Sequence, residues 1–280
     1  MRPIGLILPL LALPLLSLVA CRVGAPSAPE PSTTATEAAN RATPPAPSAP
    51  PAPLTLTAGA RDVREKTEFY EFAYSYPIDA AAIPDLRDWL EADLAKTRTG
   101  LVSEAKEGRD DAKANAYPFN PYSASSAWKV VTNLPGWLSL SALSGSYTGG
   151  AHGSFAFDAV VWDKSANMRR AATDLFTAPS ALKAAILKPF CAELSRQRAK
   201  KRAGERVGDS NDEFNTCVDP LEQTVILGST SRKGFDRIGF LIAPYNAGPY
   251  AEGTYEVTLP VTPAVFAAVK PEYRAAFVAP

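Results

Sequence analysis

Histidine is almost absent from this sequence, and His152 is its one example among 280 residues. A zinc site built on two or three imidazoles is therefore excluded. A Gly-x-Ser-x-Gly motif and a glycine-rich phosphate-binding loop are also missing from the sequence, which removes the signatures of α/β-hydrolases and of nucleotide-binding folds. We expect no bound metal, no cofactor, no catalytic residues and no enzymatic activity.

Net charge is also lacking. Lys+Arg and Asp+Glu both number 29, so the formal net charge is zero at pH 7. Domains that bind nucleic acid carry a clear excess of basic residues, because phosphate contacts supply most of their affinity. The composition therefore predicts no nucleic-acid partner.

Long apolar runs are missing except near the N-terminus, where one begins at Ile4. Pro9 and Pro14 interrupt it, and it is too short for a membrane-spanning helix, so residues 1–20 are interpreted as a secretory signal peptide. The run ends in Leu18-Val19-Ala20-Cys21, which resembles a bacterial lipobox.

The lipobox resemblance implies that Cys21 carries lipid and becomes the first residue of the mature protein. Two or more acyl chains hold a protein firmly on a membrane. We expect a lipid-anchored protein of the bacterial cell envelope that faces the periplasm. Arg22 is not the aspartate associated with inner-membrane retention, which favours the outer membrane. An ordinary signal peptide with a chance cysteine is the alternative.

Cysteine is scarce, with three residues in all. Once Cys21 is assigned to lipid, Cys191 and Cys217 remain as an even pair in a compartment that permits disulfides. We predict that they are bonded to each other. Two buried free thiols are the alternative.

Three regions follow from composition. Residues 1–20 are the signal peptide, and residues 21–57 are rich in proline, alanine and serine and contain no aromatic residue. Such a segment cannot build a core, so we expect a disordered tether. Folded sequence is expected over 58–280, as one domain or as two lobes, 58–125 and 126–280.

The folded region shows strand and helix periodicity in turn. Alternating aromatic residues over 66–76 predict a strand with one buried face, and Pro84 opens a helical pattern that would cover it. Runs over 127–134, 137–147 and 154–162 predict an antiparallel meander. A helix from about residue 179 is expected to kink or split at Pro189. Further strands are expected over 223–227, 235–243 and 254–259.

These elements predict an α+β fold, an antiparallel sheet with a few packed helices.

Five basic residues near the end of the helix that begins at residue 179 are interpreted as a solvated face near a helix C-terminus. An anionic partner is the alternative. They are Arg196, Arg198, Lys200, Lys201 and Arg202.

The most unusual short string of the domain is Gly149-Gly150-Ala151-His152-Gly153. Glycines in a hairpin accept positive φ and let another group come close, and Tyr147 and Phe155 flank the string. Taken alone, it favours a tight turn whose histidine bonds locally. A hydrolase with His152 as general base stays open as an alternative, with serines and Asp158 nearby in sequence.

The string also belongs to a wider resemblance. Tyr147 to His152, then Thr173-Asp174-Leu175-Phe176, and later the stretch from Phe240 through Tyr250 to Pro260 are similar to the RsiV-like extracytoplasmic domain family. A related module is found beside the catalytic domain of the peptidoglycan deacetylase PdaC. The resemblance extends from about Tyr70 to Phe277 and implies an α+β domain; in the anti-sigma factor itself this domain binds lysozyme.

The resemblance implies a binding function without the anti-sigma or deacetylase role, since no sigma-binding segment and no deacetylase domain are recognised in the sequence. We expect a non-catalytic envelope lipoprotein that binds either a lysozyme-like protein or a cell-wall glycan, such as peptidoglycan. A hydrolase and a structural envelope protein are the alternatives. The expected ligand-binding residues are Tyr147, Gly149, Gly150, His152, Tyr245 and Tyr250.

Overall fold

A computed structural model describes residues 61–205 and 213–280 of the chain. The predicted signal peptide, the lipidation site Cys21 and the tether over 21–57 lie outside the described residues. Within the described part, no helix combines the length and the apolar character that crossing a membrane requires. The same residues contain no group of three or more potential metal-ligating side chains.

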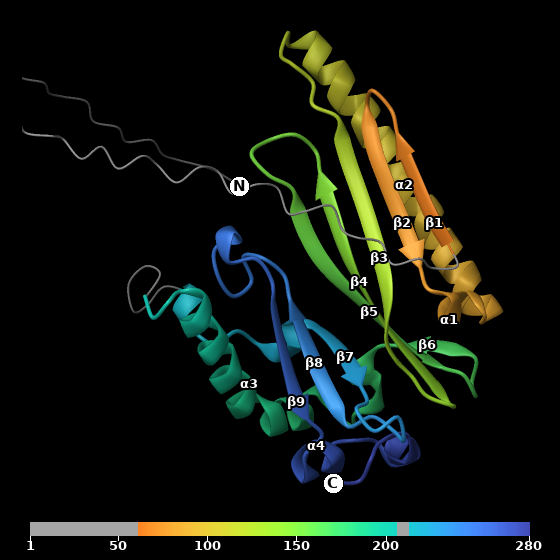
Figure 1. Ribbon diagram of the computed structural model, residues 1–280, viewed down its shortest axis with the longest axis vertical. Coiled ribbons are helices and arrows are strands. Elements are labelled where there is room, and N and C mark those ends of the chain that lie inside the picture. Colours follow the sequence, from red (N-terminus) through yellow and green to blue (C-terminus); the bar gives the residue numbers. More distant parts are fainter. Residues whose placement is uncertain (1–60, 206–212) are drawn as a thin grey trace, which may run out of the picture. The chain divides into compact units, whose positions relative to one another are not determined.

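The first layer is a six-stranded sheet with the strand order β1-β2-β3-β4-β5-β6 (Figure 1). Its alternating buried residues confirm the strand predicted over 66–76, and a further strand precedes that one. The strands are β1 (Arg61–Lys66), β2 (Tyr70–Tyr76), β3 (Tyr122–Asn133), β4 (Trp137–Tyr147), β5 (Ser154–Asp163) and β6 (Met168–Arg170).

The sheet is mixed, which corrects the expectation of a purely antiparallel one. β2 and β3 run parallel, with Tyr70 opposite Tyr122, while the other neighbours are antiparallel. The reason is the connection: α1 (Ile78–Ala81) and the long helix α2 (Pro84–Ala114) carry the chain back before β3 begins. Parallel neighbours need a crossover of this kind. β3 runs without a break through residues 125 and 126.

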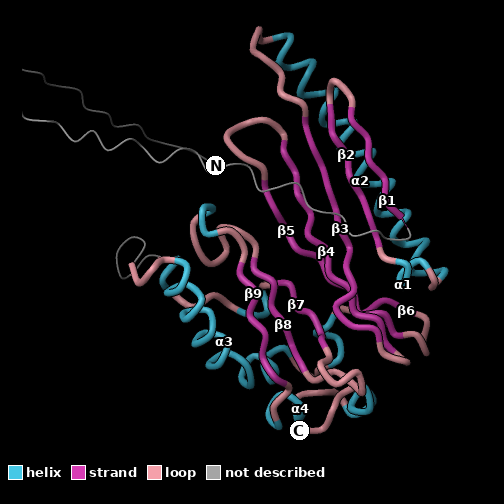
Figure 2. The backbone as a smooth tube through the Cα atoms, viewed as in Figure 1, coloured by secondary structure: helices cyan, strands magenta, loops and turns pink. Residues whose placement is uncertain are grey.

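Helix α2 covers one face of the large sheet, as its periodicity predicted (Figure 2). Leu86, Leu90 and Leu94 are at most 7% exposed and pack on Phe72 and Tyr74 of β2. Tyr74 is fully buried, and its hydroxyl donates to Asp93 while accepting from the indole of Trp128. A complete hydrogen-bond set removes the cost of burying that hydroxyl.

The second layer is an antiparallel three-stranded sheet with the order β7-β8-β9. Its strands lie where the sequence predicted them: β7 (Thr224–Gly228), β8 (Arg237–Ile242) and β9 (Tyr255–Pro260). Helix α3 (Pro179–Lys201) packs on this sheet, and the short α4 (Pro263–Ala267) follows β9.

The sequence predicted a kink or a split of this helix at Pro189. Helix α3 is one continuous helix that contains Pro189, so it does not split there. Proline removes one backbone hydrogen bond and crowds the preceding turn. Here Pro189 lies on the exposed side, while Ile186 and Phe190 on either side of it are fully buried. Burial of these two side chains fixes both halves of the helix to the same core.

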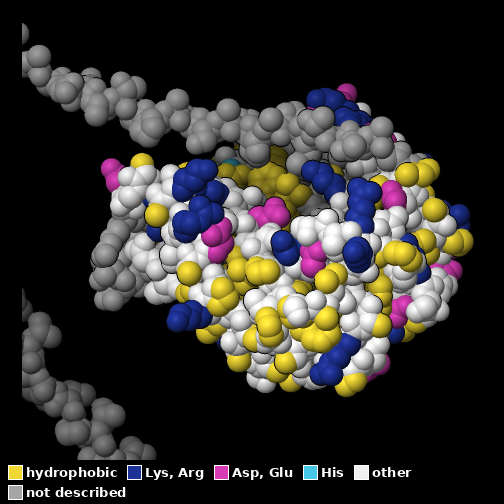
Figure 3. Space-filling model, turned by 60° about the horizontal axis from the view of Figure 1, so that its bottom comes forward, with side chains coloured by type: hydrophobic (Ala, Val, Ile, Leu, Met, Phe, Trp, Pro, Cys, Tyr) yellow, Lys and Arg dark blue, Asp and Glu magenta, His cyan; other side chains and the backbone are white. Residues whose placement is uncertain are grey.

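The two sheets also contact each other. Thr224 Oγ1 of β7 donates to the carbonyl of Phe157 in β5 at 2.9 Å, and the ring of Trp137 in β4 lies 6.0 Å from that of Phe235 beside β8. On the face shown in Figure 3, basic and acidic side chains are interspersed among apolar ones, in keeping with their equal totals.

Candidate functional site

The β4–β5 hairpin places the glycine string in a tight turn. Gly149 and Gly150 have φ of +87° and +101°, a region that glycine enters without steric cost. The hydroxyl of Tyr147 donates to the carbonyl of Gly150 at 3.1 Å. Gly153 has no room for a side chain, because an added Cβ would lie 2.8 Å from the carbonyl oxygen of Ser146. These residues fix the shape of the turn that carries His152.

The β8–β9 connection is the second loop of the site. Tyr245 has φ of +71°, and its amide donates to the carbonyl of Gly248 at 3.1 Å. Ala247 is fully buried in the core of the small sheet. A 3₁₀ turn over Tyr250–Glu252 then leads into β9. The buried alanine holds the loop down, while Tyr245 remains 52% exposed.

The two loops bring four rings together, and both lie toward the upper end of their sheets in Figure 1. His152 stacks on Tyr250 with ring centroids 4.0 Å apart, and its Nε2 lies 3.1 Å from the hydroxyl of Tyr245. The ring of Phe155 lies 6.5 Å from that of Tyr250. We call His152, Phe155, Tyr245 and Tyr250 the ring cluster.

The ring cluster joins three of the six expected ligand-binding residues across 93 positions of sequence. His152 and Tyr245 are exposed, and Phe155 and Tyr250 are half-buried. Tyr147, Gly149 and Gly150 instead shape the hairpin, through the positive φ of the two glycines and the hydrogen bond from the Tyr147 hydroxyl. Phe155 was noted only as a neighbour of the glycine string.

The histidine has two hydrogen-bond partners. Its Nδ1 lies 2.9 Å from the carbonyl of Gly153, and a carbonyl only accepts, so the neutral ring carries its proton on Nδ1. Nε2 then accepts from the hydroxyl of Tyr245. A general base of the triad type bonds to a nucleophilic hydroxyl of serine, whereas here that nitrogen contacts a phenol.

The basic end of α3 corrects another expectation. Arg198 is 4% exposed, and Arg202 forms an ion pair with Glu252 at 2.7 Å in which the two side chains are 7% and 11% exposed. Lys201 Nζ donates to the carbonyls of Glu252 and Thr254 at 2.6 and 2.5 Å. Three of the five basic residues therefore hold the β8–β9 loop, which carries Tyr245 and Tyr250 and which we call the tyrosine-bearing loop. Composition alone gave no sign of this, because their partners are mostly backbone carbonyls.

The Arg202–Glu252 pair makes stability depend on pH. Burial acts to raise the pKa of Glu252, but the hydrogen bonds from Arg202 and Tyr255 and the charge of Arg202 outweigh it and leave the pKa lowered. A depressed pKa stabilises the fold above the ordinary value of 4.5 and loses that effect as pH falls through the folded-state pKa.

We expect Glu252→Gln to lower the free energy of unfolding by about 3 kcal/mol near pH 7, because it leaves Arg202 buried without its counter-charge. The difference from the unsubstituted protein should shrink as the pH falls below about 4.5. Urea denaturation at a series of pH values measures it. A difference that is constant from pH 7 to pH 3 would contradict the assignment.

The same hairpin borders a groove on the α2 side of the large sheet. Ser146 pairs with Ser154, so it points to the face opposite Phe155. A hollow of about 300 Å³ there is lined by Asp93, Thr97 and Glu104 of α2 together with Ser146 and Thr148.

The groove continues along α2. A second hollow of about 450 Å³ shares Glu104 and Thr148 and adds Glu107, Asp111 and Tyr122. Four carboxylates and one lysine, Lys96, therefore line the two hollows. We call this region the acidic groove. Burial and the charge of Asp93 raise the pKa of Asp158 on β5.

Comparison with known proteins places part of this region in context. Residues 63–155 match the model of the family described as deacetylase PdaC, a span that includes α2, strands β2, β3 and β4, most of β1 and the turn that carries His152. This match overlaps the first part of the stretch from about Tyr70 to Phe277 over which the sequence resembles the RsiV-like family. No curated protein matches the chain.

Two solved structures are similar to the chain. One is a member of the DUF3298 family from Bacteroides fragilis, with a TM-score of 0.48 and 19% identity over 72% of this chain and 88% of that one. The other is a DUF3298 family protein from Pseudomonas aeruginosa, with a TM-score of 0.47 and 16% identity over 79% and 96% of the two chains.

Proposed function

We propose that this protein is a non-catalytic binding lipoprotein of the bacterial cell envelope, anchored through Cys21. The observation that carries the proposal is the ring cluster, in which exposed rings from two distant loops are fixed against each other. Aromatic side chains supply large contact areas at low entropic cost, and they dominate the energetics of many binding surfaces.

Of the two expected ligands, the acidic groove favours a basic protein, such as a lysozyme-like protein, over a neutral glycan. Net charge is zero for the whole chain, but the carboxylates of Asp93, Glu104, Glu107 and Asp111 outnumber the single lysine along this side of the hairpin. Complementary charge speeds association and selects partners. A partner that spans the hairpin would contact the ring cluster and the groove together.

The test is calorimetric titration of the full chain in detergent with a lysozyme and, separately, with muropeptides. We expect Tyr250→Ala to weaken binding at least about tenfold, as for an aromatic residue at the centre of an interface. Met168→Ala is the control, since Met168 is 46% exposed on β6 and lies outside both surfaces. Binding heat from neither ligand would refute the proposal.

The dependence of affinity on ionic strength distinguishes the two ligand classes. Affinity for a basic protein should fall as ionic strength rises and should fall further in Glu104→Gln/Glu107→Gln, because exposed charges are screened. Affinity for a neutral glycan should change little.

The envelope hydrolase predicts a different result. His152→Ala would abolish turnover if His152 is a general base, whereas the binding proposal expects only weaker binding. A structural envelope protein predicts no heat with either ligand.

A further inference from the structure

The C-terminal turns of α3 connect the tyrosine-bearing loop to a third segment of the chain. Nε of Arg198 donates to the carbonyl of Ala247 at 2.8 Å, and its Nη1 donates to the carbonyl of Thr216 at 2.6 Å. Arg198 is 4% exposed, and Ala247 is fully buried. Removing the guanidinium would therefore take a hydrogen-bond donor from the carbonyl of a buried residue.

Arg202 repeats this arrangement one turn later. It holds both carboxylate oxygens of Glu252 at 2.7 and 3.2 Å, and it donates to Asn215 Oδ1 at 2.9 Å and to the carbonyl of Phe214 at 3.1 Å. A guanidinium has five donors in a planar fork, which suits several acceptors at once. Both arginines therefore connect the β8–β9 loop with residues 214–216.

The loop has little freedom around these contacts. Glu252 closes the 3₁₀ turn that begins with Tyr250, and it also accepts from the hydroxyl of Tyr255. Gly248 faces that carboxylate so closely that an added Cβ would lie 2.1 Å from Glu252 Oε2. The backbone between Tyr245 and Tyr250 is thus packed directly against the group that Arg202 holds.

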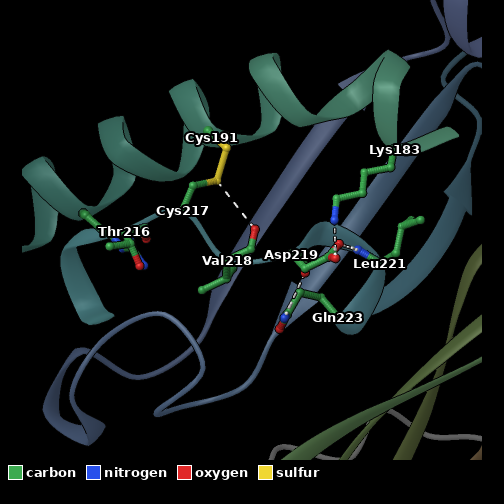
Figure 4. Close-up of a disulfide and its surroundings, with 9 residues drawn as sticks. Lys183, Cys191, Thr216, Cys217, Val218, Asp219, Leu221 and Gln223 are labelled. Carbon is green, nitrogen blue, oxygen red and sulfur yellow. Dashed lines mark hydrogen bonds and ion pairs between the residues drawn. A yellow bond between two sulfur atoms is a disulfide. The ribbon is translucent and has the colours of Figure 1, made fainter. Parts of the chain in front are cut away.

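The disulfide fixes the third segment to the same helix. Cys217 follows Thr216 and is bonded to Cys191 of α3, with Cα atoms 5.5 Å apart (Figure 4). Cys191 precedes Arg198 by seven residues, which is about two helical turns. One helix therefore carries the disulfide and both arginines, and these three attachments hold residues 214–217 beside the loop.

We propose that Arg198 and Arg202 are positioning residues of the ring cluster, which they hold in its binding geometry through the Ala247 carbonyl and Glu252. The disulfide keeps the acceptors of residues 214–216 in place for both guanidiniums. The proposal rests on the proposed function, since it takes the ring cluster to be the binding surface. It adds that contacts on the buried side of the loop hold the ring cluster in its geometry.

The single histidine offers a direct readout. His152 is the only source of imidazole signals in the chain, and its stack on Tyr250 at 4.0 Å places its ring protons in the shielding region of the tyrosine ring. Proton–carbon NMR of the full chain in detergent therefore reports the stack without any ligand. Tyr250→Ala gives the reference shifts for an unstacked His152.

We expect Arg198→Met and Arg202→Met to move the His152 signals toward those of Tyr250→Ala and to weaken lysozyme binding at least about tenfold. Arg196→Met is the matched control, because the Arg196 side chain is 66% exposed and pairs with Glu193 on the same helix. It should leave both the signals and the affinity unchanged.

Folded Arg198→Met and Arg202→Met proteins with unchanged His152 signals would overturn the proposal. If either methionine variant does not fold, lysine at the same position replaces it, as Arg198→Lys or Arg202→Lys, because an ammonium keeps the charge but cannot reproduce the fork of a guanidinium; unchanged signals there would overturn the proposal equally. Shifted signals in a protein that binds no lysozyme would support the positioning role and refute the proposed function instead.

Discussion

Alanine at Phe190 is expected to lower the free energy of unfolding by about 3–5 kcal/mol, the usual cost of truncating a buried phenylalanine. Phe190 is fully buried between α3 and the small sheet, and its ring meets that of Phe240 edge-on with centroids 5.1 Å apart. The substitution removes this contact and leaves a cavity. Because Ile186 and Leu194 hold the helix in place, the helix cannot move to fill that cavity. Urea denaturation followed by circular dichroism measures the loss.

The control for Phe190→Ala is Leu187→Ala on the same helix. Leu187 is 37% exposed, so its truncation should cost less than about 1 kcal/mol. Equal effects of the two substitutions would contradict the packing of α3 described here.

Tryptophan fluorescence makes the Phe190 experiment more informative, because all four tryptophans lie on the large sheet or on α2. They are Trp89, Trp128, Trp137 and Trp162. The described residues belong to one compact unit, Pro47–Pro280, and Trp137 touches Phe235 of the small-sheet core. The fluorescence transition should therefore shift together with the circular dichroism transition. A large sheet that unfolds separately would give two midpoints.

Much of this fold was predictable because its strands and helices have clear periodicity. Phe72, Tyr74 and Tyr76 alternate in sequence and are each at most 3% exposed, and the leucines of α2 that cover them recur at helical spacing. The direction of strand pairing was not predictable in this way. Periodicity identifies the buried face of a strand but says nothing about whether its neighbour runs parallel, and β2–β3 was missed for that reason.

The residues of the site also differ in whether the sequence could predict their role. His152, Tyr245 and Tyr250 were selected because their sequence neighbourhoods resemble a known family, and no spacing rule joins residues 93 positions apart. Arg198 and Arg202 were expected to belong to a solvated basic face, because basic side chains suit the C-terminus of a helix. Their partners are the carbonyls of Ala247, Thr216 and Phe214 and the carboxylate of Glu252. Backbone acceptors leave no trace in a sequence.

Removal of the Cys191–Cys217 disulfide is the second change with a large expected effect. The bond joins residues 26 positions apart, as the even pairing of cysteines predicted. In the chain-entropy account, closing a loop of this length stabilises the folded state by about 3.5 kcal/mol, because it restricts the unfolded chain. Cys191→Ser/Cys217→Ser should therefore lower the free energy of unfolding by about that amount in urea denaturation.

Two further contacts bear on the size of that loss. Lys183 of α3 donates to Asp219 at 2.6 Å (Figure 4) and holds the pKa of that carboxyl below its ordinary value, so the chain just beyond Cys217 keeps an attachment to α3 without the disulfide. Thr216, on the other side, keeps the hydrogen bond from Arg198 of α3. Adding Lys183→Met to the double serine variant should therefore cost more than Lys183→Met alone, since the two attachments share one segment. Strictly additive losses would show that the disulfide acts on the unfolded chain only and does not hold residues 214–217 beside the tyrosine-bearing loop.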